Sequence, residues 1–282
     1  MEVGPLNKIG LVIQARMGSS RLPDKVLLPL PFINGKPILF RITDELQHLG
    51  SNYRIVVATT TNKSDDIIEE TCKSKKILCY RGSENNVLSR YTEIAKKYDF
   101  EHMVRLTADN PFICSLQIKK VVLHHLNMDS DYTSSKSLPI GMNVEIVRSA
   151  SLIKSESLIK NAFDKEHVTT CIRRENIFKK SIITYDDKFE KYRLTVDTSN
   201  DFLLANFIAS ISDNSDKRGL DLLHLLNKKY SWILNSNENI PQKNSQTIPV
   251  EEIKGAIKFL KDYCYNHSAK ILNNAIQDFK EG

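Results

Sequence analysis

The chain has 282 residues, and 41% of them are hydrophobic, which is enough for a substantial buried core. Its 40 lysines and arginines outnumber its 34 acidic residues by six, a small excess that does not indicate nucleic-acid binding. The five cysteines show no CxxC spacing, and no window reaches the roughly 18 apolar residues of a membrane span; we therefore expect a cytoplasmic protein without disulfides, structural zinc or membrane insertion.

Short apolar runs alternate with amphipathic segments of helical length in the first half of the chain. The spacing predicts strands at 9–13, 53–58, 77–80 and 102–106, and helices at 38–49, 65–73, 87–98 and 116–126. This alternation is typical of βαβ units on a mostly parallel sheet. We therefore expect an α/β domain of the nucleotide-binding kind.

The predicted elements become shorter after about Asp131. The pattern predicts strands at 131–134, 142–147, 181–184 and 192–196, and helices at 149–159, 164–174, 200–212 and 220–226. No linker rich in proline, glycine and serine precedes these elements. We therefore assign them to the second half of the same sheet, with an inserted subregion.

The composition changes again near the C-terminus. Residues 236–250 are rich in asparagine, serine, glutamine and proline, which is typical of a linker, and we place it directly after a domain at 1–235. Residues 251–282 have the apolar spacing of one amphipathic helix. Such a helix is expected to dock on its own domain or on a second subunit.

The loop after the first predicted strand has an unusual composition. In VIQARMGSSRLPDKVLLPL, residues 12–30, an apolar run is followed by small residues among cations: Arg16, Gly18, Ser19, Ser20, Arg21 and Lys25. Small residues let backbone N–H groups approach an anion, and fixed cations balance its charge. The loop matches neither GxxxxGK[ST] nor GxGxxG. It therefore predicts a polyphosphate ligand held differently from that of the common ATPases and dehydrogenases.

Two aspartates follow predicted strands at the edge of the sheet where ligands bind. Asp109 ends a strand in RLTADNPFI, and Asp197 ends another in RLTVDTSNDF. Ligands of α/β sheets lie beyond the carboxyl ends of the strands. Because Mg²⁺ prefers a few carboxylates together with phosphate oxygens and water, the pair predicts a metal site beside the polyphosphate.

Eight blocks of this sequence resemble, in order, the motifs of a known family. They are QARMGSSRLPDKVLLPL, INGKPIL, IVVATTTNKSDD, YRGSENNVLSRY, VRLTADNPFI, GMNVEI, KEHVTTCIRR and RLTVDTSNDF. The family is that of the cytidylyltransferases that include the spore coat polysaccharide biosynthesis protein SpsF. CMP-Kdo and CMP-sialate synthetases are similar at a greater distance. The resemblance covers about residues 7–235.

The resemblance implies a nucleotide-diphospho-sugar transferase fold, which is GT-A-like and Rossmann-like, with a mixed, mostly parallel sheet flanked by helices. The expected C-terminal helical extension lies outside the resemblance. It implies transfer of CMP from CTP to a sugar or sugar-like acid, or its phosphate, with release of pyrophosphate. The implied context is cell-surface polysaccharide or glycoconjugate biosynthesis. Mg²⁺ is the implied cofactor and a homodimer the implied assembly.

The resemblance also implies roles for individual residues. The implied catalytic residues are Arg16, Lys25, Asp109 and Asp197, of which the two aspartates would bind Mg²⁺. The implied nucleotide-binding residues are Ala15, Arg16, Gly18, Ser19, Ser20, Arg21, Lys25, Thr59, Arg81, Gly82, Ser83, Asn86 and Asp109. The implied acceptor-binding residues are Asn143, Glu145, Glu166, His167 and Arg173.

The chain departs from the family pattern on the acceptor side. Asn143 and Cys114 stand where the family usually has acidic residues, and ADNP stands in place of a GDCP-like segment. The turn PLPFINGKP is longer than usual. The phosphate and metal positions are intact, so the departures affect the identity of the acceptor.

The motifs leave other functions open. A sugar-1-phosphate nucleotidyltransferase that uses another base fits the same motifs. A glycosyltransferase of related fold usually carries a DxD motif, which ADNP does not supply. A non-catalytic nucleotide-binding scaffold would not need a leaving-group clamp together with two metal carboxylates. His167 fits three roles equally: a base, a cation that pairs with an acidic acceptor, or a structural hydrogen-bond partner.

Overall fold

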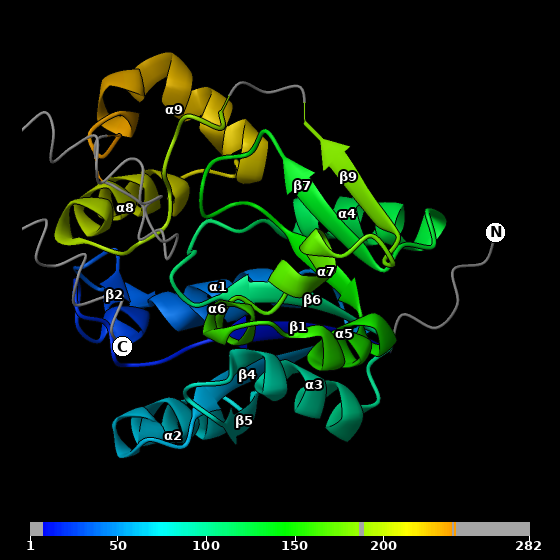
Figure 1. Cartoon of the computed structure of the whole chain (residues 1–282). Coiled ribbons are helices and arrows are strands. Elements are labelled where there is room, and N and C mark those ends of the chain that lie inside the picture. Colours follow the sequence, from blue (N-terminus) through cyan, green and yellow to red (C-terminus); the bar gives the residue numbers. More distant parts are fainter. Residues whose placement is uncertain (1–7, 186–188, 239, 241–282) are drawn as a thin grey trace, which may run out of the picture. The chain divides into compact units, whose positions relative to one another are not determined.

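The computed structural model describes residues 8–185, 189–238 and 240, and within them seven strands form one mixed sheet (Figure 1). The strands are β1 (Ile9–Gln14), β4 (Tyr53–Thr60), β5 (Leu78–Gly82), β6 (His102–Thr107), β7 (Tyr132–Lys136), β8 (Glu145–Arg148) and β9 (Lys180–Thr184). Their order across the sheet is β5-β4-β1-β6-β8-β7-β9. Only β8 is antiparallel to its neighbours in the described sheet. The predicted mixed, mostly parallel α/β sheet is therefore confirmed.

Helices cover both faces of the sheet because its central strands are apolar on both faces. Leu11 and Ile13 of β1 point into one core, and Val12 points into the other. The first core is covered by α1 (Ile38–Gln47), α2 (Asp66–Ser74), α4 (Ser115–Asn127), α8 (Ser199–Ser212) and α9 (Gly219–Leu234). The second is covered by α3 (Val87–Tyr98), α5 (Ser149–Ser155) and α7 (Thr170–Arg174), with α6 (Ala162–Glu166) beside α3.

Short elements complete the described fold. A two-stranded antiparallel sheet joins β2 (Pro29–Leu30) to β3 (Lys36–Pro37). The 3₁₀ helices are η2 (Lys25–Leu27), η3 (Lys63–Asp65) and η4 (Glu156–Leu158). In the described residues, no helix is both long enough and apolar enough to cross a bilayer.

Two predicted elements differ from the structure. The predicted strand at 192–196 is a buried extended segment that makes a single bridge, between Ile140 and Arg193, so its pairing is too short for a strand. The predicted helix at 164–174 is split into α6 and α7, because Val168 has a positive φ of 50° that no helix accommodates.

The sheet reverses its strand order at β1. The chain continues from β1 to β4 on one side, and β6 later pairs with the other side. A reversal of this kind opens a crevice beyond the carboxyl ends of the strands, where α/β proteins bind ligands. The loop after β1 lies at this edge.

A buried carboxylate fixes the loop after β1 to the end of β4. Asp65, which is 1% exposed, accepts the backbone N–H of Met17 at 2.8 Å through Oδ1. Its Oδ2 accepts the N–H of Thr60 at 3.3 Å and also the Thr60 hydroxyl. Among the described residues Asp65 makes no ion pair, so these backbone and hydroxyl donors are what satisfy its carboxylate.

Two histidines form a buried polar chain near the start of β6. His102 Nδ1 lies 3.0 Å from His125 Nε2, and His125 Nδ1 lies 2.8 Å from Thr133 Oγ1. The Thr133 hydroxyl is in turn 2.7 Å from that of Ser181. Burial lowers the pKa of His125 to about 3 and also lowers the pKa of His102. Both imidazoles are therefore neutral at pH 7.

The predicted linker at 236–250 and helix at 251–282 lie almost entirely outside the described residues. Asn237, at the start of the predicted linker, is buried. It donates to the carbonyl of Arg193 at 3.0 Å and to Asp201 Oδ1 at 2.8 Å.

Replacing Asp65 with asparagine is expected to lower the free energy of unfolding by about 1–3 kcal/mol, since one N–H donor would face an amide NH₂ group. The neighbouring Asp66→Asn variant is a matched control, because its half-exposed side chain makes a surface ion pair with Arg81 and should cost at most about 1 kcal/mol. Urea unfolding measures both. Equal losses in the two variants would contradict the assigned role of Asp65.

The buried histidines are expected to make the protein sensitive to acid. The unfolded chain protonates His125 near its ordinary pKa of 6.5, whereas the folded protein does so only near 3. Stability should therefore fall as the pH decreases from about 6.5 toward 3, by at most about 1.4 kcal/mol per pH unit for this residue. The fall should be shallower in His125→Gln when urea unfolding is measured at several pH values. Identical pH dependence in the two proteins would rule this out.

Candidate functional site

Three predicted catalytic side chains meet beyond the end of β6. Lys25 Nζ donates to Asp109 Oδ2 at 2.8 Å and to Asp197 Oδ1 at 2.6 Å. Lys25 is 8% exposed, whereas the two carboxylates are partly open to solvent. The N–H of Val196 donates to the carbonyl of Asp109 at 2.8 Å, which fixes the two acidic segments side by side.

The remaining oxygens of both carboxylates are also occupied. Asp109 Oδ1 accepts the hydroxyl of Thr107 at 2.6 Å. Asp197 Oδ2 lies 3.0 Å from Nη2 of Arg193 and 3.2 Å from Nη2 of Arg21. Burial by itself would raise the pKa of Asp197, but the adjacent Lys25, Arg21 and Arg193 outweigh burial and lower it. The carboxylate therefore remains charged.

Arg193 and Asp201 hold this cluster in place through an ion pair and hydrogen bonds. Neither residue was identified from the sequence. Arg193 is 4% exposed, and its Nε donates to Asp201 Oδ1 at 3.0 Å. Asp201 caps α8 reciprocally with Thr198 and accepts the N–H of Asp197 at 3.0 Å. The sequence signal was present as a capping box, T-x-x-D, before an apolar helical run.

The loop between β1 and Lys25 is largely open. Arg16 is exposed, and in the described residues it makes no hydrogen bond or ion pair. Gly18 has open space where a Cβ would be, and Ser20 is exposed. Ser19 donates its N–H to the carbonyl of Met17 at 2.7 Å. Asp24 then adopts a left-handed conformation, with φ of 56°, immediately before η2 carries Lys25 inward.

The residues predicted to surround the base lie along the ends of β1, β4 and β5. Ala15 donates its N–H to the carbonyl of Ala58 at 3.1 Å, and Thr59 is in register with Arg81. Gly82 ends β5, Ser83 Oγ accepts the N–H of Asn86 at 3.2 Å, and Asn86 caps α3.

The structure directs Arg81 toward α2. Its guanidinium donates to the carbonyls of Thr60 and Asn62, both at 2.9 Å, and pairs with Asp66 and Glu69. A nucleotide-binding role for its side chain stays a prediction. Arg90 of α3, missed in the sequence, is 1% exposed beneath these strand ends. Its Nη1 donates to the carbonyl of Ala58 at 3.4 Å, and burial lowers its pKa.

On the predicted acceptor side, Glu145 is the centre of a polar cluster. It accepts the Tyr132 hydroxyl at 2.7 Å, Arg105 Nη1 at 3.2 Å and the Thr169 hydroxyl at 3.2 Å. Burial favours a raised pKa for Glu145, but Arg105, Tyr132 and Arg173 together lower it. Sequence reasoning did not identify Arg105, Tyr132 or Thr169, because the first two belong to otherwise ordinary strands and Thr169 to a turn that the sequence did not predict.

The other predicted acceptor residues lie at or near this cluster. Arg173 is exposed, and its charge contributes to the pKa of Glu145. His167 packs against Phe163 with ring centroids 4.2 Å apart and the rings tilted by 47°, and burial lowers its pKa. Glu166 is exposed, and Asn143 is exposed without a hydrogen bond from its side chain in the described residues.

A strained turn presents His167 and Thr169. The N–H of Thr169 donates to the carbonyl of His167, and Val168 between them is buried with φ of 50°. A γ-turn with positive φ at a β-branched residue is rare and costs of order 1–3 kcal/mol. Strain of this kind gathers at functional sites, so the turn makes the cluster around Glu145 a candidate.

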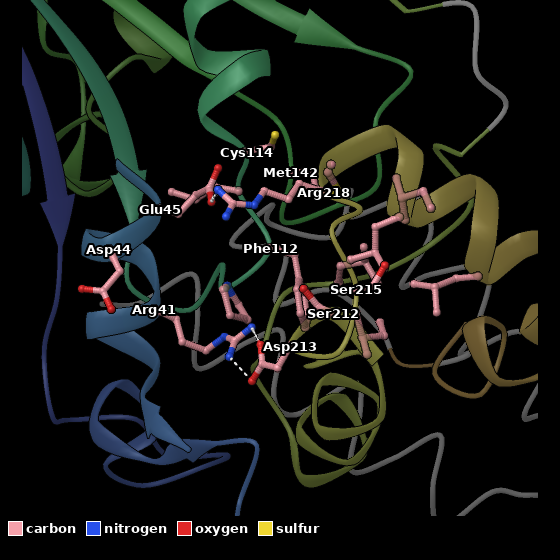
Figure 2. A pocket seen from close by; sticks show the side chains of 18 of the residues that line it. Arg41, Asp44, Glu45, Phe112, Cys114, Met142, Ser212, Asp213, Ser215 and Arg218 are labelled. Carbon is pink, nitrogen blue, oxygen red and sulfur yellow. Dashed lines mark hydrogen bonds and ion pairs between the residues drawn. The ribbon is translucent and has the colours of Figure 1, made fainter. Parts of the chain in front are cut away.

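A cavity of about 570 Å³ is lined in part by residues 111–114, which follow Asp109 in the chain (Figure 2). Phe112, Cys114 and Met142 contribute to its wall. Arg41 of α1 forms two hydrogen bonds with Asp213, at 2.9 and 2.8 Å. Arg218 lies 3.6 Å from Glu45. Both of these arginines are thus paired at the cavity, whereas Arg16 of the loop makes no ion pair among the described residues, so the loop is the better candidate for binding an anionic ligand.

Comparison with known proteins identifies the family. The cytidylyltransferase family model matches residues 11–243. The spore coat polysaccharide biosynthesis protein SpsF of Bacillus subtilis is 33% identical over 230 residues, which are 79% of this chain and 95% of SpsF. The 3-deoxy-manno-octulosonate cytidylyltransferase of Colwellia psychrerythraea is 27% identical over 174 residues, 59% of this chain and 58% of that protein.

A solved structure is similar over the same region. It is that of a cytidylyltransferase from Leptospira borgpetersenii, with a TM-score of 0.75 and 30% identity, covering 86% of this chain and 98% of that chain. Sequence and fold thus agree with the eight motifs of the chain. The chain belongs to the cytidylyltransferase family.

Proposed function

We propose that this protein transfers CMP from CTP to an acidic sugar or a sugar phosphate and releases pyrophosphate. The observation that carries the proposal is the position of Lys25 between Asp109 and Asp197, beside an open loop rich in small residues. Nucleotidyl transfer depends on fixed charges at the phosphates, and this arrangement supplies them. The names of the relatives suggest a role in polysaccharide biosynthesis.

The two carboxylates fit a Mg²⁺ ion. They already face one cation from two sides, and carboxylate oxygens are among the ligands that Mg²⁺ prefers. Bound there with the nucleotide, Mg²⁺ would neutralise negative charge on the phosphate oxygens. Asp109 and Asp197 would hold it, with phosphate oxygens and water as the other ligands.

The cations of the loop after β1 stabilise the negative charge of the leaving group. Arg16, Arg21 and Lys25 come from one loop, so they can contact neighbouring phosphates and stabilise the pyrophosphate as it leaves. An acceptor oxygen forms a bond to the α-phosphorus while the bond from that phosphorus to the bridging oxygen of pyrophosphate breaks. An acceptor phosphate attacks without losing a proton. An acceptor hydroxyl must lose one, and His167, whose lowered pKa keeps it neutral at pH 7, is the candidate base.

The cluster around Glu145 supports an acidic acceptor. Arg105 pairs with Glu145, and the exposed Arg173 near them is a cation that an anionic substrate can reach. Arginine binds carboxylate and phosphate groups well because its planar fork donates two parallel hydrogen bonds. We keep the homodimer and the cytoplasmic location as parts of this proposal.

Pyrophosphate release tests the reaction. With CTP, Mg²⁺ and a panel of acidic sugars and sugar phosphates, Lys25→Ala and Asp109→Asn should each reduce turnover by about 10²–10³-fold, as the loss of one fixed charge or donor typically does. Lys36→Met is the matched control, because this exposed lysine pairs with Asp44 outside the cluster. Near wild-type turnover in both Lys25→Ala and Asp109→Asn would refute the site.

Nucleotide binding tests the base. CTP should raise the free energy of unfolding by about 2.7 kcal/mol when present at 100 times its dissociation constant. ATP, GTP and UTP at the same concentration should stabilise less, and thermal unfolding measures the difference. If all four nucleotides gave the same shift, the cytosine assignment would have to be abandoned.

A further inference from the structure

The ammonium of Lys25 lies between the two aspartates that would hold a metal ion. It donates to Asp109 Oδ2 at 2.8 Å and to Asp197 Oδ1 at 2.6 Å. The other two oxygens are held by Thr107, at 2.6 Å, and by Arg193 and Arg21, at 3.0 and 3.2 Å. A divalent ion can reach both carboxylates here only if Lys25 moves away.

The cluster is electrically balanced without a metal. Among the described residues its ion pairs join the carboxylates of Asp109, Asp197 and Asp201 to the cations of Lys25, Arg21 and Arg193, three charges of each sign. Displacing Lys25 by a free metal ion would leave a largely buried ammonium without its partners. Removing the partner of a buried charge is strongly unfavourable.

A triphosphate changes this balance. Its negative charges offer Lys25 a new partner, and the loop that carries Lys25 also carries the exposed Arg16 and the open backbone at Gly18. The flexible four-carbon stem of a lysine allows its ammonium to exchange one partner for another. The carboxylates are then released at the moment when phosphate oxygens become available as further metal ligands.

We propose that Lys25 is an internal counter-ion that occupies the metal position until the phosphates of the nucleotide draw it away, so that the divalent metal binds together with the nucleotide. The inference deepens the proposed function and rests on it for the identity of the nucleotide. By linkage, each ligand raises the affinity of the other by the same factor.

The test is the affinity of the nucleotide-free protein for Mn²⁺, measured from the electron paramagnetic resonance signal of free Mn²⁺. Wild-type protein should bind weakly. Lys25→Met should bind Mn²⁺ about 5- to 150-fold more tightly, the range of typical coupling between two ligands. Lys25→Met/Asp109→Asn should lose that gain, because one of the two carboxylates is gone.

Arg16→Met is the matched control, since it removes a loop cation that contacts neither aspartate in the described residues. It should leave the affinity for Mn²⁺ unchanged. Equal affinities of wild type and Lys25→Met, or an equal gain in Arg16→Met, would overturn the inference. Cooperative urea unfolding verifies that each variant is folded.

A second measurement needs no Lys25 variant. Suppose that wild-type protein bound Mn²⁺ as tightly without CTP as with it, and that the Asp109→Asn variant did not bind Mn²⁺. Lys25 would then not occupy the metal position as we infer. Failure of this inference can be distinguished from failure of the proposed function, because the Mn²⁺ titrations use neither an acceptor nor pyrophosphate release.

Discussion

A single ammonium group shared by two carboxylates joins three distant segments of this protein. Lys25 is separated from Asp109 by 84 residues and from Asp197 by 172. In a partly buried cluster each charge depends on the others, and removing one partner typically costs about 3–5 kcal/mol. The loop after β1, the end of β6 and the segment before α8 are therefore coupled through this interaction and through the backbone bond from Val196 to Asp109.

Neighbouring groups hold the cluster in place: some form hydrogen bonds with its backbone, and others pair with its charged side chains. Asp65 fixes the loop through N–H donors, Arg193 and Asp201 hold Asp197, and Asn237 ties the end of the described chain to Asp201. None of these groups needs to touch a substrate in order to matter. Each helps to determine where a side chain of the proposed site lies, and this explains why the proposed metal and phosphate ligands converge although the segments carrying them are far apart in sequence.

Several buried polar atoms near the crevice lack partners within residues 8–185, 189–238 and 240. These atoms are Oε1 of Gln14 at the end of β1, Oγ1 of Thr59 near the end of β4, and the Nε atoms of Arg90 in α3 and Arg105 in β6. A buried polar atom without a partner costs about 1–3 kcal/mol. Gln14 and Thr59 lie at strand ends beside the loop after β1, where a polar ligand that paired with them would recover part of this cost. Such a pattern agrees with a site shaped for a polar ligand.

The amino-acid sequence by itself determined the α/β class, most strands and helices, the family and the position of Asp109 just after β6, whereas Asp197 follows an extended segment and not the predicted strand. Periodicity suffices for the class and the elements because it reports which side of a local segment is buried. The sequence also indicated a loop for anions, since small residues and cations occur together there.

Only the tertiary structure decided which charge pairs with which. Nothing in the sequence distinguishes Arg21, which reaches Asp197, from Arg16, which is exposed, or reveals that Arg81 turns toward α2. The sequence likewise does not reveal the partners of Arg90, Arg105 and Asp65. Nor does it reveal the break between α6 and α7 at Val168. The partner of a side chain depends on distances between residues far apart along the chain, and those distances are set by the packing of the whole domain.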